Sequence, residues 1–302
     1  MIASFCSRFC LCLLGSTSVG AALLSTAQAE EIEAVSSRVS ADYVRAKLPD
    51  GSFQPETYAF AKGGYRSSGT QDYSIDKIQF LDVARTIAGP LATQRYIPAK
   101  DPKTTRLLVM VYWGATASLT HSSDSAGYQN LQLAQGALSS AQMDSHGMPA
   151  GGGIAADQNE LDASLALVNL ENHIRDRADA ENAALLGYDS WWDKYSGHAV
   201  FGTALAEHKQ EMIDELEEGR YFVVLMAYDF QLLLKEKKHK LLWETRFSVR
   251  QRGNEFDKQL EKMAQYASTY FGQDSHGLTH KPLPEGQVEI GDLKNLGVVP
   301  EK

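Results

Sequence analysis

The densest group of side chains with chemical potential is the segment GYDSWWDKYSGH, residues 187–198. It places aromatic rings beside carboxylates. That combination suits sugars, because a ring stacks on the apolar face of a sugar while the acids accept hydrogen bonds from its hydroxyls. Two correctly separated carboxylates also serve glycoside hydrolysis. The sequence therefore predicts a candidate glycan-binding or glycan-cleaving site formed by Tyr188, Asp189, Trp191, Trp192 and Asp193.

The same segment also has the spacing of a packed helix. Tyr188, Trp191, Trp192 and Tyr195 follow the pattern i, i+3, i+4, i+7, which places all four on one helical face. Aromatic side chains dominate ordinary core burial, so such a stripe often packs against a neighbouring element. The alternative interpretation is thus a helix packed on a sheet, and we favour it over the glycan site.

A second candidate site lies near the C-terminus. Asp274, His276 and His280 offer one carboxylate and two imidazoles, and the histidines have the i, i+4 spacing of a helical metal site. Gly277 between them and Pro282 after them indicate a loop, so the alternative is a set of solvated loop residues.

The chain has neither a G-x-S-x-G elbow nor a G-x-x-x-x-G-K-[ST] phosphate loop. We therefore predict no catalytic residue and no cofactor.

The first 29 residues have the features of a secretory signal peptide. Arg8 provides a basic start, Phe9–Leu24 is apolar, and the sequence AQA at 27–29 is a pattern after which signal peptidase cuts. We expect a mature chain that starts at Glu30 and is periplasmic or extracellular. A spanning helix needs about 20 apolar residues. The remaining apolar runs are shorter, so we expect no transmembrane segment after signal cleavage.

Cysteine usage and charge exclude several classes of site. All three cysteines, Cys6, Cys10 and Cys12, lie in the signal segment. The mature chain is therefore expected to lack disulfides, thiolate zinc sites and iron–sulfur clusters. No small-residue box precedes a cysteine, which argues against a lipid anchor. The formal net charge of −9 argues against nucleic acid as a partner.

Residues 30–302 are predicted to form a single α+β domain: a mixed sheet of about four strands with packed helices, interrupted by a loop and helical insertion at about 115–219. Val35, Val39, Tyr43 and Val44 recur at near-helical spacing in the first short segment. The expected order after it is a strand at 52–60, a loop at 62–72, a helix from Ser74 that Pro90 kinks or divides, a strand at 104–114, a loop at 115–156, helices at about 157–186 and 203–218, strands at 220–228 and 241–249, and a helix at 254–271.

Two strand predictions are specific about burial. TTRLLVMVYWG, residues 104–114, is a continuous apolar run, which predicts a strand buried on both faces. LLWETRFSV, residues 241–249, alternates instead, so that Trp243, Thr245, Phe247 and Val249 share one face. Gly187 is expected to end the long helix before it.

The runs KTTRLLVMVYWG and KHKLLWETRFSV, the second followed by an amphipathic helix, carry a family resemblance. Together they resemble an α+β module of unknown function from bacterial envelope lipoproteins. It is similar in outline to the curli-secretion lipoprotein and to the amino-terminal domain of the Tol-Pal periplasmic protein. The resemblance covers about half of the mature chain and implies no catalytic residues. The chain departs from it by lacking the lipobox cysteine and by its insertion of roughly a hundred residues.

Charge is divided unevenly along the chain. Residues 235–252, which include the Lys-rich tip of a predicted hairpin, carry a net charge of +5, whereas residues 157–218 carry −11. The tip is interpreted as a solvated turn that protects a sheet edge; the alternatives are docking on the acidic insertion or binding an external anion. We expect a non-enzymatic exported protein whose insertion presents a surface to another envelope protein.

Overall fold

The computed structural model describes residues 33–119, 122–144, 153–195 and 203–281. These residues confirm the α+β class. In spatial order, the strands of the sheet are β3 (Tyr96–Pro98), β2 (Glu56–Arg66), β4 (Leu107–Ala115), β5 (Arg220–Asp229), β6 (Leu241–Arg250), β1 (Glu33–Val39) and β7 (Leu278–His280). The first three are parallel and the other neighbours antiparallel. Seven strands correct the prediction of about four, which overlooked two three-residue edge strands and β1.

Strand β1 replaces the near-helical spacing predicted for its segment. It pairs with β6 from Glu33↔Val249 to Val39↔Trp243 and with β7 on its other side. Its hydrogen-bond partners therefore lie far away in the chain. The local spacing of Val35 and Val39 contains no information about these distant partners. Backbone hydrogen bonding to them makes the segment a strand.

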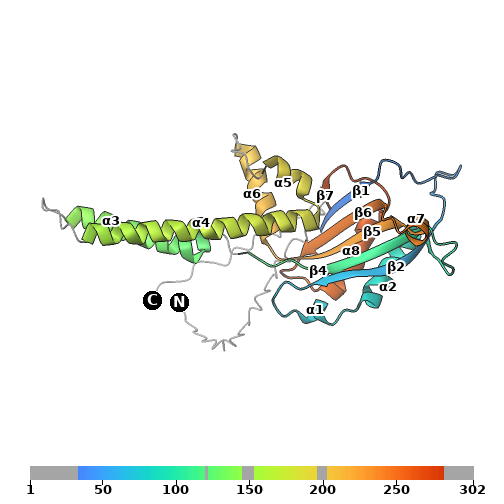
Figure 1. The fold of residues 1–302 in the computed structure, drawn as a ribbon, viewed down its shortest axis with the longest axis horizontal. Coiled ribbons are helices and arrows are strands. Elements are labelled where there is room, and N and C mark those ends of the chain that lie inside the picture. Colours follow the sequence, from blue (N-terminus) through green and yellow to red (C-terminus); the bar gives the residue numbers. More distant parts are fainter. Residues whose placement is uncertain (1–32, 120–121, 145–152, 196–202, 282–302) are drawn as a thin grey trace, which may run out of the picture.

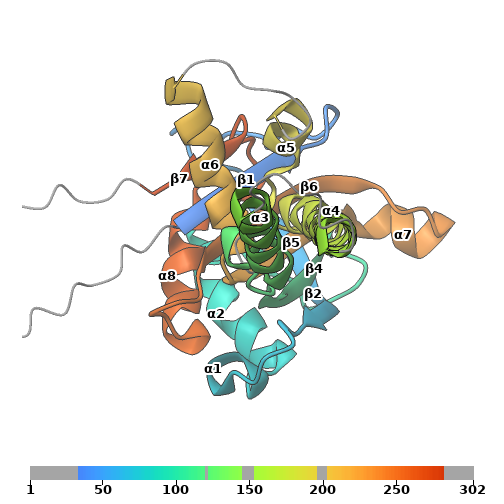
Figure 2. The same ribbon diagram turned by 90° about the vertical axis from the view of Figure 1, so that its left-hand side faces the viewer.

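The helices α1 (Tyr73–Asp76), α2 (Phe80–Thr93) and α8 (Phe256–Ser268) cover one face of the sheet (Figure 2). The predicted alternation of β6 is confirmed, because Trp243, Thr245, Phe247 and Val249 are all buried. The α2 helix continues through Pro90, so the expected division does not occur. Pro90 lies in the last turns of α2, where the loss of one N–H donor affects few helical bonds.

The opposite face is only partly covered, and this corrects the prediction for β4. Val109 and Val111 are buried, but Leu108, Met110 and Tyr112 on the second face are only half-buried. The end of α4 (Gly153–Leu186), α5 (Asp189–Tyr195) and α6 (Thr203–Glu217) pack over one end of this face. The described residues leave the other end open, so that Leu108 and Tyr228 are half-buried there. A continuous apolar run does not distinguish a strand with two covered faces from a strand with one.

Gly187 ends α4 as predicted. Its φ of 88° lies in the left-handed region that glycine adopts at low cost. A Cβ at this position would lie 2.4 Å from Cβ of Ser36, so glycine also allows the end of α4 to approach β1 closely. This turn directs the chain from α4 into α5.

The insertion contains a long helical hairpin. The sequence predicts a loop over 115–156, whereas α3 (Ala126–Asp144) forms there after a short 3-10 turn at Ser122–Asp124. It packs along α4, whose 34 residues span about 51 Å. The α3–α4 hairpin, called the arm below, projects away from the sheet (Figure 1). The N–H of Gly127 donates to both carboxylate oxygens of Glu171 on α4, at 3.1 and 3.2 Å. This cap comes from another helix, so the local sequence pattern does not reveal it.

The tip between β5 and β6 is a short helix, α7 (Phe230–Glu236). Asp229 caps it by accepting a hydrogen bond from the N–H of Leu232 at 2.9 Å. After it, Lys238 pairs with Glu236 at 2.9 Å and Lys240 pairs with Asp42. These ion-pair partners lie outside the acidic insertion; Lys238 is exposed and Lys240 is half-buried. The contacts fit the solvated-tip interpretation.

Candidate functional site

The aromatic cluster predicted from the sequence lies between α4 and α6. Tyr188 is fully buried, and its hydroxyl donates to Oε2 of Glu215 at 2.5 Å. Trp191 and Trp192 are half-buried and pack against the apolar cluster under α4, α5 and α6. Tyr188 is therefore inaccessible to a ligand, and the tryptophans have one side engaged in packing.

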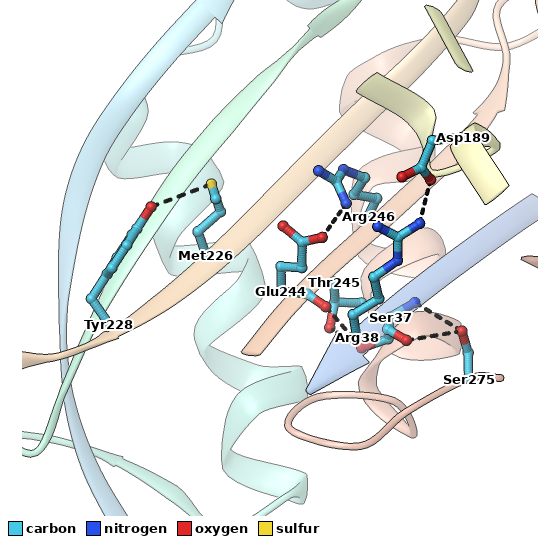
Figure 3. Close-up of polar contacts among 9 residues, drawn as sticks. All are labelled: Ser37, Arg38, Asp189, Met226, Tyr228, Glu244, Thr245, Arg246 and Ser275. Atoms are coloured by element: carbon cyan, nitrogen blue, oxygen red, sulfur yellow. Dashed lines mark hydrogen bonds and ion pairs between the residues drawn. The ribbon is translucent and has the colours of Figure 1, made fainter. Parts of the chain in front are cut away.

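The two acids of this cluster have different environments. Asp189 accepts a hydrogen bond from Arg38 of β1 at 2.5 Å, and this ion pair fastens the start of α5 to the sheet (Figure 3). Asp193 is exposed on the last turn of α5. The pair is thus divided between a structural contact and solvent.

The structure keeps Asp274 beside His276, with 3.5 Å between Oδ1 and Nδ1, and places His280, the third residue of the predicted metal site, against a different partner. Asp274 accepts a hydrogen bond from the backbone N–H of His276 at 2.6 Å, and the side chain of His276 is exposed. His280 lies in β7 and contacts Glu215 of α6 through Nε2, at 3.1 Å. The described part of the chain contains no group of three His, Cys, Asp or Glu side chains close enough to hold a metal ion.

Glu215 joins the two candidate sites, which the sequence did not connect. Its Oε2 accepts from Tyr188, contacts His280 and lies 3.9 Å from a guanidinium nitrogen of the buried Arg220. Burial raises the pKa of the Glu215 carboxyl, but the hydrogen bond from His280 and the charge of Arg220 outweigh this and leave the pKa below its ordinary value. The ionised carboxylate on α6 therefore connects the turn before α5 with β5 and β7. No local pattern signals it, because its three partners come from separate parts of the chain.

The arm meets the body of the protein at a buried pair of acids. Asp179 on α4 is 2% exposed, and Glu217 at the end of α6 is also buried. Nε of Arg175 pairs with Glu217 at 3.3 Å. Burial and the nearby charge of Glu217 raise the pKa of Asp179 to about 7. Nearby, the side chain of Asn182 donates to the carbonyl of Leu216 at 3.1 Å, so α4 and α6 are held by polar contacts at this junction.

The open part of the second sheet face contains a groove of about 450 Å³ beside the last turns of α4. Its apolar lining includes Tyr112, Val224 and Met226. Its charged lining consists of Arg66, Arg246 and Glu181. The groove therefore combines an apolar surface with a small number of charged groups, as binding pockets for small molecules often do.

A glycine shapes this groove. The sequence predicts a loop from Lys62 onward, but β2 continues to Arg66 across a β-bulge between Lys62 and Gly64. A Cβ at Gly63 would lie 2.6 Å from the ring of Tyr112. Glycine at 63 thus lets the Tyr112 ring lie close against β2, and the bulge places Arg66 at the groove.

Side-chain pairs involving Arg246 and Met226 lie at the groove (Figure 3). Arg246 is paired with Glu244 two residues earlier on β6. On β5, the Tyr228 hydroxyl lies 3.8 Å from the sulfur of Met226. Ser37 on the opposite side of β1 bonds to Thr245 at 2.7 Å, and this buried contact supports the register between β1 and β6.

No family model matches this chain, and comparison with curated proteins finds no match either. Functional inference therefore depends on the geometry of the molecule itself.

Three residues of the two candidate sites have structural contacts. Tyr188, Asp189 and His280 are each engaged in contacts that connect elements of the fold. The accessible surfaces include the arm and the open sheet face. Among the described helices, none combines the length and apolar character needed to cross a membrane.

Proposed function

We propose that this is an exported, non-enzymatic envelope protein whose arm binds another envelope protein. The observation that carries the proposal is the exposure of large aliphatic side chains on a hairpin that projects from the sheet. Leu133, Leu170 and Ile174 are 72%, 56% and 61% exposed. Apolar side chains gathered on one exposed surface often mark a protein interaction site.

These three side chains lie on one face of the arm. Leu170 and Ile174 are four residues apart and therefore neighbours on α4. Each helical residue turns by about 100°. Ala134 on α3 and Ser164 on α4 are buried positions that face the other helix. Measured around each helix axis from these positions, Leu133 and Leu170 are rotated by similar angles. In an antiparallel pair of helices, equal rotations from the contact line place side chains on the same side of the pair. We call Leu133, Leu170 and Ile174 the aliphatic face.

The aliphatic face fits a third helix. Two helices alone bury little of their apolar surface, and an amphipathic helix from a partner would cover this face in the manner of other helix-in-groove complexes. Residues 153–174 of the arm contain four acids and neither Lys nor Arg. Charge complementarity therefore favours a partner helix flanked by basic residues.

The first test uses a photo-crosslinking amino acid in the native host. Placed at position 170, it is expected to give a specific adduct with a partner segment that has helical apolar spacing and flanking Lys or Arg. The double variant Leu170→Glu, Ile174→Glu, probed from position 133, is expected to reduce the adduct at least tenfold, because two charges on the aliphatic face oppose burial.

Leu165 provides the matched control, since it is an exposed leucine that turns to the opposite side of α4. A crosslinker at 165 is expected to give no such adduct, and Leu165→Glu is expected to leave adduct formation unchanged. Equal adducts from 165 and 170, or an adduct that survives the double variant with its helix content intact by circular dichroism, would contradict the proposal.

Export is tested separately by the intact mass of protein purified from the native host. Removal of the signal peptide after Ala29 predicts a chain that starts at Glu30 and carries no acyl group. A retained N-terminal segment or an added acyl mass would show that the protein is processed differently.

A further inference from the structure

We infer that the groove beside α4 binds a single-chain amphiphile with a carboxylate head, such as a free fatty acid. The chain would lie along the open sheet face and the carboxylate would meet Arg66. This site is independent of the aliphatic face of the arm.

The open face supplies an apolar track for the chain. On β4, Leu108, Met110 and Tyr112 point to this face, and in the antiparallel register Met110 lies opposite Met226 and Leu108 opposite Tyr228. All of these side chains are half-buried, so they shield one another but keep one side open to solvent. Methionine adapts its shape to flexible apolar ligands.

The track has the dimensions of one extended acyl chain. From Leu108 to Tyr112 the strand advances four residues, or about 13 Å. The groove at the Tyr112 end, of about 450 Å³, lies within the size range of small-molecule pockets. On the neighbouring strand β6 the same face carries the charged Glu244–Arg246 pair. The apolar track is therefore confined to β4 and β5 and is wide enough for one acyl chain.

The charges at the groove select an anion. Arg246 is already paired with Glu244, and Glu181 with Arg177 at 3.1 Å. Arg66 also lines the groove, and in the described part of the chain no carboxylate lies within ion-pair distance of it. The remaining charge at this end is therefore positive. A guanidinium binds a carboxylate through two parallel hydrogen bonds, which makes the exposed Arg66 the residue that would hold the head group.

The test is a titration of the full-length mature protein with laurate below its micelle concentration, followed by calorimetry. We expect one saturable site and at least tenfold weaker binding of dodecyltrimethylammonium, which has the same chain and the opposite charge. Arg66→Gln is expected to weaken laurate binding about tenfold. Arg85→Gln is the control, because Arg85 is an exposed arginine on α2, the helix that covers the other face of the sheet.

The methyl resonances of methionine locate the site without any substitution. Laurate is expected to shift the signals of Met110 and Met226 and to leave that of Met263, a buried residue of α8, in place. Equal affinity for the two amphiphiles, unchanged binding in Arg66→Gln, or shifts confined to other methionines would overturn the inference. So would Arg66-dependent flotation with phosphatidylglycerol vesicles in the absence of laurate binding, or a stable dimer that Met226→Gln dissociates, since these assign the face to a bilayer or to a second copy.

Discussion

Replacing Trp243 by alanine is expected to lower the free energy of unfolding by about 3–5 kcal/mol, the usual loss for a large buried aromatic side chain. The indole is 1% exposed. It stacks on Phe271 with ring centroids 6.1 Å apart and an interplanar angle of 17°, and it contacts Tyr96 at 5.8 Å. Truncation would leave a cavity between β6, β3 and the end of the α8 segment. Urea or guanidinium unfolding of wild type and variant measures the loss.

Trp243→Phe is the matched control. It keeps a ring against Phe271, and the indole Nε1 has no hydrogen-bond partner in the described residues, so its removal leaves no acceptor unpaired. The expected loss is below about 1.5 kcal/mol, as for other substitutions that largely conserve volume. An alanine variant with the midpoint and slope of wild type would show that the indole is not in the core.

Replacing Asp179 by asparagine is expected to increase the free energy of unfolding, by an amount that becomes larger as the pH rises. Asp179 is buried close to Glu217, with Arg175 and Asp176 as the other charged groups nearby. Its Oδ1 finds no hydrogen-bond partner in the described residues. Ionised Asp179 is therefore unfavourable in the folded state. An amide of the same shape removes that charge and keeps the packing.

The direction with pH follows from the raised pKa. The Asp179 pKa is about 7 in the folded state, against an ordinary 3.8. Between these values the folded protein holds a proton that the unfolded chain has lost. Wild-type stability therefore falls as pH rises from about 4 to about 7, by at most about 1.4 kcal/mol per pH unit from this group. Above pH 7 the difference is constant.

At pH 8, Asp179→Asn is expected to be more stable than wild type by about 2–4 kcal/mol, and near pH 3.5 the two should be nearly equal. Urea midpoints measured across this range provide the comparison. Asp162→Asn is the control, because Asp162 is an exposed acid on α4 that is not among the charges acting on Asp179. If the Asp179 variant gained the same stability at every pH, burial of the Asp179 charge would not be its cause.

The features that the sequence predicted correctly are local in origin. The alternation of Trp243, Thr245, Phe247 and Val249 follows from the two-residue period of a strand. Phe256, Leu260 and Met263 of α8 are buried as their helical spacing predicts, and Gly187 ends α4. In each case the residues that determine the structure are close together in the chain.

The features that the sequence did not reveal depend on distant partners. Strand β1 is held by β6 and β7, and α3 is capped by Glu171 of another helix. Glu215 connects Tyr188 with His280, which belonged to two unrelated candidate sites. The sequence also did not predict the open half of the second sheet face, because an apolar run is compatible with a strand covered on one face or on both. Spacing along the chain contains no information on any of these contacts.

The position of β1 has a consequence for the order of folding. Its register with β6 joins residues more than 200 positions apart, and β7 follows still later in the chain. Contacts of such long range slow folding, because a large loop must close before they form. Strand β1 is synthesised first, but it can pair only after β6 and β7 have been synthesised. A nascent chain that ends before β6 displays β1 as an unpaired strand, with Ala34 and Val35 uncovered, and must be kept from pairing with other chains until residues 241–280 arrive.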